Sequence, residues 1–230
     1  MWGTPTYLIF GLPALLLALY AQWRVSSTYR KYLRVPNSGG MTGLQVAQYL
    51  LRSTGLAVRI EGVAGELTDH YDPRNKALYL SQGVAHSSSV GAVAVVAHEF
   101  GHAMQDEEAF ALLRLRSGLV PVVNFTTWLG PLIFFVGLLL QYEPLATIGV
   151  FFVAGAVVFS LLTLPVELDA SRRAMQLLKQ SSILTDEMAL SGARKMLSAA
   201  ALTYVAALAQ ALSTLLYYIS FLSGGRRRRV

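Results

Sequence analysis

Two histidines and a glutamate within five residues are the part of this sequence best suited to chemistry: His98-Glu99-Phe100-Gly101-His102. On a helix, residues i and i+4 lie one above the other, so His98 and His102 could bind the same ion. Neutral imidazoles favour zinc, with Zn–N distances of about 2.0–2.1 Å. Glu99 lies about 100° farther round the helix, where its carboxylate could take a proton from water instead of binding the metal. The alternative interpretation is a helix with two unrelated histidines.

A third protein ligand must be His, Asp or Glu, because the chain contains no cysteine. Catalytic zinc uses three protein ligands and keeps one position open for water. Glu167 is the strongest candidate, since it directly follows a long apolar segment, where a carboxylate needs a partner. Asp169 is a rival ligand or, failing that, a partner for a ligating histidine. Without a metal, Glu167 would be an interfacial carboxylate or the ion-pair partner of Arg172 or Arg173.

The composition is typical of a membrane protein. Apolar residues make up 54% of the 230 residues and charged residues only 14%, whereas soluble domains have about 45–50% and 25%. The net charge of +6 does not indicate a nucleic-acid partner, because the basic residues follow a pattern of membrane topology. We therefore expect a lipid bilayer as a partner and no nucleic acid.

Apolar segments divide the chain into five predicted parts, and most of these segments are long enough to cross a hydrocarbon core of about 30 Å. The expected fold class is a mainly α integral membrane protein with about four transmembrane helices and a small α+β, zincin-like section. The last apolar segment could instead lie along the membrane interface. The parts are an N-terminal membrane anchor (1–23), the section with both histidines (24–117), a transmembrane hairpin (118–166), the helical section of the third ligand (167–195), and a C-terminal apolar helix with an arginine-rich tail (196–230).

The basic residues also predict which side of the membrane each part faces. Residues 24–116 and 172–195 hold fifteen of the nineteen lysines and arginines, and the turn at 141–144 holds none. Basic residues next to spans mark the cytoplasmic side, so both polar sections should face the cytoplasm. The hairpin would then return Glu167 to the face that carries the two histidines. The arginine-rich tail could bind anionic lipid if it is cytoplasmic.

Capping residues predict two helices in the polar section. Thr42 is typical of an N-cap, and Gly55 of a helix end. The serines at 87–89 offer an N-cap for the helix that carries both histidines. Near the end of that helix, Asp106 could orient His102 or belong to a solvated acidic terminus.

Two short strands are predicted at 58–61 and 77–81, with a turn-rich loop at 69–76 between them. The second strand could be an edge strand beside which a peptide lies. Alternatively, it is an ordinary strand of a small sheet.

Three motifs resemble a known family: Asp69-His-Tyr-Asp-Pro-Arg, His98-Glu-Phe-Gly-His-Ala-Met-Gln, and Val166-Glu-Leu-Asp-Ala-Ser-Arg-Arg-Ala. Together they resemble the YugP-type neutral zinc metallopeptidases of bacterial membranes, over nearly the whole chain. More distantly the chain is similar to HtpX-type and CAAX prenyl membrane proteases, whose third ligand is the glutamate of Glu-x-x-Ala-Asp. Ser171 replaces the aspartate of that pattern, so its role would fall to another residue, with Asp169 as the candidate.

The resemblance implies a gluzincin-like site in which His98, His102 and Glu167 hold Zn²⁺ and Glu99 is the general base. It also implies a location in the bacterial inner membrane. The function expected is therefore a zinc-dependent metalloendopeptidase that acts on membrane-associated protein or peptide substrates.

Two other classes of function are less compatible with the sequence. A membrane adaptor with a structural metal would require four protein ligands, and only three are evident. A channel or transporter would require ionisable residues within the spans, and such residues are nearly absent from them.

The sequence does not identify the group that would stabilise an oxyanion, because no histidine follows His102. Arg172, Tyr71 and His70 are candidates. For Arg172 and Arg173 the alternative is a solvated or lipid-facing basic pair.

Overall fold

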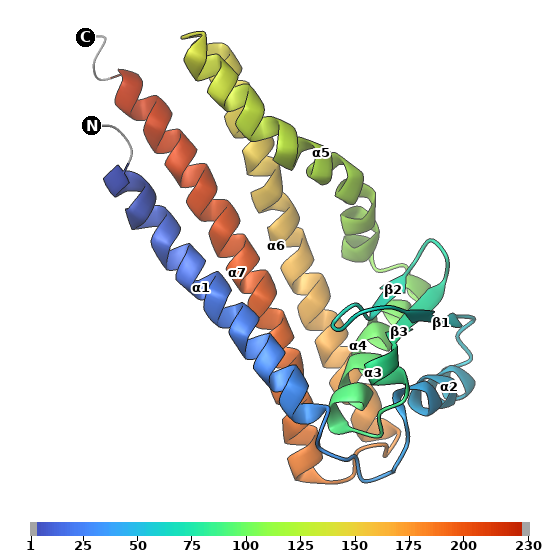
Figure 1. Ribbon diagram of the computed structural model, residues 1–230. Coiled ribbons are helices and arrows are strands. Elements are labelled where there is room, and N and C mark those ends of the chain that lie inside the picture. The colour runs from blue at the N-terminus through green and yellow to red at the C-terminus, as the bar shows by residue number, and fades with distance from the viewer. Residues whose placement is uncertain (1–3, 227–230) are drawn as a thin grey trace. The chain divides into compact units, whose positions relative to one another are not determined.

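The computed structural model describes residues 4–226, and Figure 1 shows the path of the chain. Two compact units are formed. The helical unit contains the described residues up to Gln22, Leu115–Pro165 and those from Thr203, and the mixed unit contains Trp23–Arg114 and Val166–Leu202. The elements are α1 (Thr4–Tyr32), α2 (Gly43–Thr54), β1 (Arg59–Val63), β2 (His70–Asp72), β3 (Ala77–Ser81), α3 (Gln82–Ala85), α4 (Val90–Glu107), α5 (Ala111–Leu139), α6 (Glu143–Gln180) and α7 (Glu187–Arg226).

Four helices among the described residues are long and apolar enough to cross a membrane, which confirms the predicted number of spans. They are Leu8–Tyr32, Ala111–Leu139, Glu143–Gln180 and Glu187–Ser223. The helices extend well beyond the apolar segments. In particular, α6 continues into the polar section as far as Gln180, because Ala, Leu, Met, Gln, Lys and Arg all favour helix. Arginines 227–229 of the predicted tail lie outside the described residues.

All three predicted helix caps in the polar section are confirmed. The Thr42 side chain accepts from the Gln45 amide, and the Gln45 side chain accepts from the Thr42 amide, which makes a capping box. Gly55 ends α2 in the left-handed conformation. Ser89 caps α4 by accepting from the Ala92 amide. These caps fix where the helices of the mixed unit begin.

The sheet has one strand that was not predicted, and residues 77–81 do not lie at its edge. β2 forms within the segment predicted as a loop, and it pairs antiparallel with β3, while β1 pairs parallel with β3. The strand order is β1-β3-β2. The hypothesis that residues 77–81 form an edge strand is therefore wrong. β3 is the central strand, and four of its five residues are buried.

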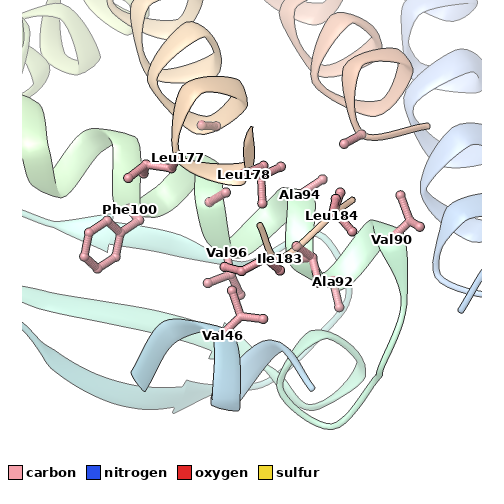
Figure 2. Close-up of a cluster of buried hydrophobic side chains, with 14 of the residues drawn as sticks. Val46, Val90, Ala92, Ala94, Val96, Phe100, Leu177, Leu178, Ile183 and Leu184 are labelled. Atoms are coloured by element: carbon pink, nitrogen blue, oxygen red, sulfur yellow. The ribbon is translucent and has the colours of Figure 1, made fainter. Parts of the chain in front are cut away.

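Helix α4 lies in the core of the mixed unit, with 13 of its 18 residues buried. Figure 2 shows its apolar side chains among residues from α2, the second half of α6 and the turn that follows. Because so much of α4 is covered, the polar side chains of Glu99, His102 and Gln105 are buried as well. Buried polar groups need hydrogen-bond or metal partners.

Glycine allows the backbones of α4 and α6 to approach closely. A Cβ at Gly101 would lie 2.6 Å from the carbonyl oxygen of Ala170, a separation that real Cβ atoms do not reach. The approach brings the residues just before Ala170 beside the turn of α4 that carries the histidines.

Helices α5 and α6 approach each other in the same way within the helical unit. A Cβ at Gly137 would lie 2.3 Å from the nitrogen of Ala146, and one at Gly149 would lie 2.5 Å from the nitrogen of Phe134. Small residues at such crossings are common between helices in membranes.

Candidate metal centre

The structure brings His98 and His102 of α4 together with Glu167 of α6. One ligand atom from each of the three lies within 4.8 Å of the other two. The Glu167 Oε2 is 3.3 Å from His98 Nε2 and 3.4 Å from His102 Nε2. Glu167 and His102 are buried and His98 is partly buried, so the cluster lies within the mixed unit.

The two separations from Glu167 Oε2 fit a tetrahedral zinc ion. Ligand atoms about 2.0–2.1 Å from a tetrahedral metal lie roughly 3.3 Å from one another. Two imidazole nitrogens and a carboxylate oxygen also form the donor set of common catalytic zinc sites, which keep a fourth position for water. The described residues therefore form a three-ligand site that zinc would fit.

Each histidine has a partner on the ring nitrogen that faces away from the cluster. His102 Nδ1 is 2.9 Å from Gln105 Oε1, and His98 Nδ1 is 3.3 Å from Ser171 Oγ. Both histidines consequently present Nε2 to Glu167. Partners of this kind fix the ring orientation of metal-binding histidines.

Gln105 belongs to a network that links α4 to α6. Its Nε2 donates to the Val166 carbonyl and to Asp169 Oδ2, both at 2.9 Å. Asp169 also accepts from Arg172 and from Arg173 Nε, and Arg173 Nη1 donates to Glu108 at 2.7 Å. This network holds the α6 turn that carries Glu167.

Glu99 lies beside the ligands but outside the clustered atoms. The Tyr71 amide of β2 donates to Glu99 Oε2 at 3.0 Å. Burial raises the pKa of Glu99, and the two histidines and the Tyr71 hydrogen bond oppose that rise. A buried carboxylate with a raised pKa and a fixed position is suited to accept and return a proton.

A family model described as "Putative neutral zinc metallopeptidase" matches residues 7–223. The chain belongs to this family. It is also 41% identical to the "Putative membrane protease YugP" of Bacillus subtilis (strain 168). The similar region is 221 residues long and covers 96% of this chain and 98% of the relative. No solved structure matches the chain. The resemblance read from the three motifs is thus confirmed.

The neutral zinc metallopeptidase match includes every residue of the cluster. Ser171, which is outside the cluster, stands where the pattern Glu-x-x-Ala-Asp of the more distant membrane proteases has its aspartate. Its hydroxyl lies against His98. The position that departs from the pattern is thus one that contacts a histidine of the cluster.

Two carboxylates predicted near the histidines have other partners. Asp169 is not among the clustered atoms of the described residues, and it reaches His102 only through Gln105. The partner of His102 Nδ1 is Gln105 and not Asp106. Asp106 accepts from the Tyr71 hydroxyl at 2.7 Å and from Lys76 Nζ at 2.6 Å.

The residues considered for oxyanion stabilisation are engaged elsewhere. The Tyr71 hydroxyl donates to Asp106, His70 is stacked on Tyr79 with ring centroids 4.7 Å apart, and Arg172 pairs with Asp169. The interpretation of Arg173 as a solvated or lipid-facing side chain is wrong. It is only 14% exposed and pairs with Asp169 and Glu108.

Gln105 is a part of the site that was not predicted from the sequence. Its sequence signal is spacing, because residue i+3 of a helix can reach the side chain of residue i. Glutamine three residues after His102 fits that spacing. Its other partners, however, lie 61 and 64 residues away in the chain.

Proposed function

We propose that this protein is a membrane-embedded zinc metalloendopeptidase that cleaves peptide bonds of membrane-associated proteins. The observation that carries the proposal is the cluster of His98, His102 and Glu167 at separations that fit zinc, with Glu99 beside it and outside it. The family match and the relative's printed name support the same activity.

In this proposal His98, His102 and Glu167 hold the metal, and Glu99 moves the proton. When bound, zinc polarises the scissile carbonyl and makes water easier to deprotonate. Glu99 accepts a proton from the attacking water as the oxygen bonds to the carbonyl carbon. It then delivers that proton to the amide nitrogen as the C–N bond breaks. The Tyr71 amide holds the Glu99 carboxylate in place for both transfers.

We further propose that the site faces the cytoplasm of a bacterial inner membrane. The basic residues of 24–116 and 172–195 support this orientation, since lysines and arginines next to membrane spans are enriched on the cytoplasmic side. Single cysteines at Gln82 and Gln180 should resist an impermeant thiol reagent in intact cells, and one at Tyr142 should react. Reaction of the cysteine at position 82 with the external reagent would show that the site faces the opposite side of the membrane.

The activity is tested with Glu99→Gln, with Glu107→Gln as a matched control at the exposed end of the same helix. Glu99→Gln should keep about one zinc per chain and lose cleavage of membrane proteins by roughly 10²–10⁴-fold, the usual contribution of a general base. Glu107→Gln should leave both unchanged. Cleavage products are measured by mass spectrometry of membranes from cells that express each variant.

Equal product levels from wild type and Glu99→Gln would refute the peptidase proposal. If zinc were still bound in that case, the site would be structural, as in the adaptor interpretation. Absence of zinc from the purified wild-type protein would refute the metal assignment itself.

A further inference from the structure

We propose that Gln105 is a positioning residue that holds His102 in one tautomer, with its proton on Nδ1 and the lone pair of Nε2 directed to the metal site. This inference rests on the zinc-binding part of the proposed function. It concerns a residue that touches neither substrate nor metal and acts through His102.

The orientation of the Gln105 amide follows from its partners. Two of them, the Val166 carbonyl oxygen and the Asp169 carboxylate, can only accept hydrogen bonds. Both are 2.9 Å from Nε2, so this atom has to be the NH₂ group. A flipped amide would place its oxygen against two oxygens and leave the side chain, which is fully buried, without either bond.

The tautomer of His102 follows from that orientation. With the NH₂ group committed, Oε1 is the atom that faces His102 Nδ1, at 2.9 Å. An amide oxygen accepts and cannot donate, so Nδ1 must carry a proton. The neutral ring then has its lone pair on Nε2, which faces Glu167 at 3.4 Å.

His98 has no such constraint. Its Nδ1 contacts the Ser171 hydroxyl at 3.3 Å, and a hydroxyl can rotate to donate or accept. Its side chain is also partly exposed, whereas that of Gln105 is not. The site therefore has one histidine whose tautomer is fixed by a buried amide and one whose tautomer is free to adapt.

Asp169 is held so that it keeps the amide oriented. Arg172 and Arg173 both donate to this carboxylate, so it stays charged and accepting. Arg173 is anchored in turn by Glu108. The chain of contacts from Glu108 to His102 alternates donors and acceptors at each step, and it runs from the end of α4 through α6 and back to α4.

Two substitutions separate positioning from simple packing. Gln105→Met keeps the approximate volume and removes every hydrogen bond. Gln105→Glu, combined with Asp169→Asn so that the pair can still hydrogen-bond, keeps an acceptor for His102 Nδ1. Both variants lose the donor to the Val166 carbonyl, so the difference between them reports the acceptor for His102. Gln48→Met, at an exposed position on α2, is the matched control.

The first measurement is zinc affinity by competition with a chelator. Loss of a partner of a metal-binding histidine typically weakens binding 10–100-fold. We expect such a loss in Gln105→Met, a smaller loss in the Gln105→Glu/Asp169→Asn double variant, and no change in Gln48→Met. Wild-type affinity in Gln105→Met would overturn the proposal. Equal weakening in Gln105→Met and the double variant would also overturn it, because the acceptor for His102 would then make no difference to zinc binding.

The second measurement is the histidine nitrogen spectrum, which four histidines make tractable. With ¹⁵N-labelled histidine, wild type and the double variant should show a His102 proton on Nδ1 that exchanges slowly with water. In Gln105→Met the His102 Nδ1 proton should exchange rapidly with water. A neutral His102 with its proton on Nε2 would refute the inference.

The spectrum can be recorded with the metal-free protein, since the Gln105 contacts involve only the chain. Failure of wild type to bind zinc would therefore refute the proposed function while leaving the tautomer assignment measurable.

Discussion

Helix α6 packs through glycine in both units, with different consequences. In the helical unit, Gly137 and Gly149 allow close contact with Ala146 and Phe134, and the surrounding side chains are apolar. In the mixed unit, Gly101 allows equally close contact with Ala170, and the neighbouring turns carry histidine and glutamate. The same steric feature therefore serves packing alone in one unit and brings three potential ligands together in the other.

The two units also differ in how they cover apolar surface. The buried cluster of the helical unit is small, and large side chains such as Phe125, Trp128 and Phe151 are 60–71% exposed, as expected of surface that faces lipid. The mixed unit has an extensive core drawn from six of the helices and from the sheet. A core of that kind can hold buried polar groups in fixed positions.

The largest effect is expected from removing Glu167, the proposed third ligand, which the Gly101 contact brings beside the histidines. Glu167→Ala should reduce zinc from about one per chain to near zero, because two histidines alone bind zinc weakly compared with three ligands. Metal analysis of the purified protein measures this. Glu187→Ala, exposed at the start of α7, is the control. Full zinc retention in Glu167→Ala would show that the third ligand lies elsewhere.

The next largest effect is expected at the contact itself. In Gly101→Ala the added methyl overlaps the Ala170 carbonyl, so α6 must move away from α4 and Glu167 with it. We expect zinc affinity to fall at least about 10-fold, because the groups that orient the ligands would be displaced. The free energy of unfolding should fall by about 1–3 kcal/mol from overpacking. Chelator competition and thermal unfolding measure the two. Unchanged zinc affinity would contradict the role given to this contact.

The matched change in the helical unit should separate stability from metal binding. Gly149→Ala places a methyl against the backbone of Phe134, and it should also lower stability by about 1–3 kcal/mol. Zinc per folded chain should remain at the wild-type value, since the three ligands belong to the other unit. Both are measured in detergent. If Gly149→Ala lost zinc without losing stability, the contact at Gly149 would affect metal binding as the contact at Gly101 does.

The smallest effect is expected at Gly118 of α5. No atom lies within 4 Å of a Cβ added there, and alanine favours helix over glycine by about 1 kcal/mol. Gly118→Ala should leave zinc binding unchanged and alter stability by at most that amount, in the stabilising direction. A loss comparable to that of Gly149→Ala would mean that helix glycines in this unit matter for a reason other than close contact.

How far the sequence could predict the site depends on the distance along the chain between partners. His98, Glu99 and His102 could be identified because their geometry is set within one helix. Glu167 could be nominated from the order of apolar segments. The role of Gln105 could not be predicted, because it depends on a carbonyl and a carboxylate more than sixty residues away.

The fold shows the same division. The four long helices and the caps at Thr42 and Ser89 follow from local composition and could be predicted. β2 was missed because a three-residue strand has no periodicity, and its existence depends on pairing with β3. The length of α6 was underestimated because the change from apolar to polar residues at 166 marks a change of surroundings, while the helix itself continues.

The hydrogen bond from the Tyr71 amide to Glu99 gives the protein an internal kinetic probe. A buried amide exchanges its hydrogen for deuterium only when its hydrogen bond opens. The exchange rate at Tyr71 therefore measures how often the Glu99 carboxylate separates from β2. Because the donor belongs to the main chain, this rate can be read without altering any side chain of the site, and any ligand that engages Glu99 would change it.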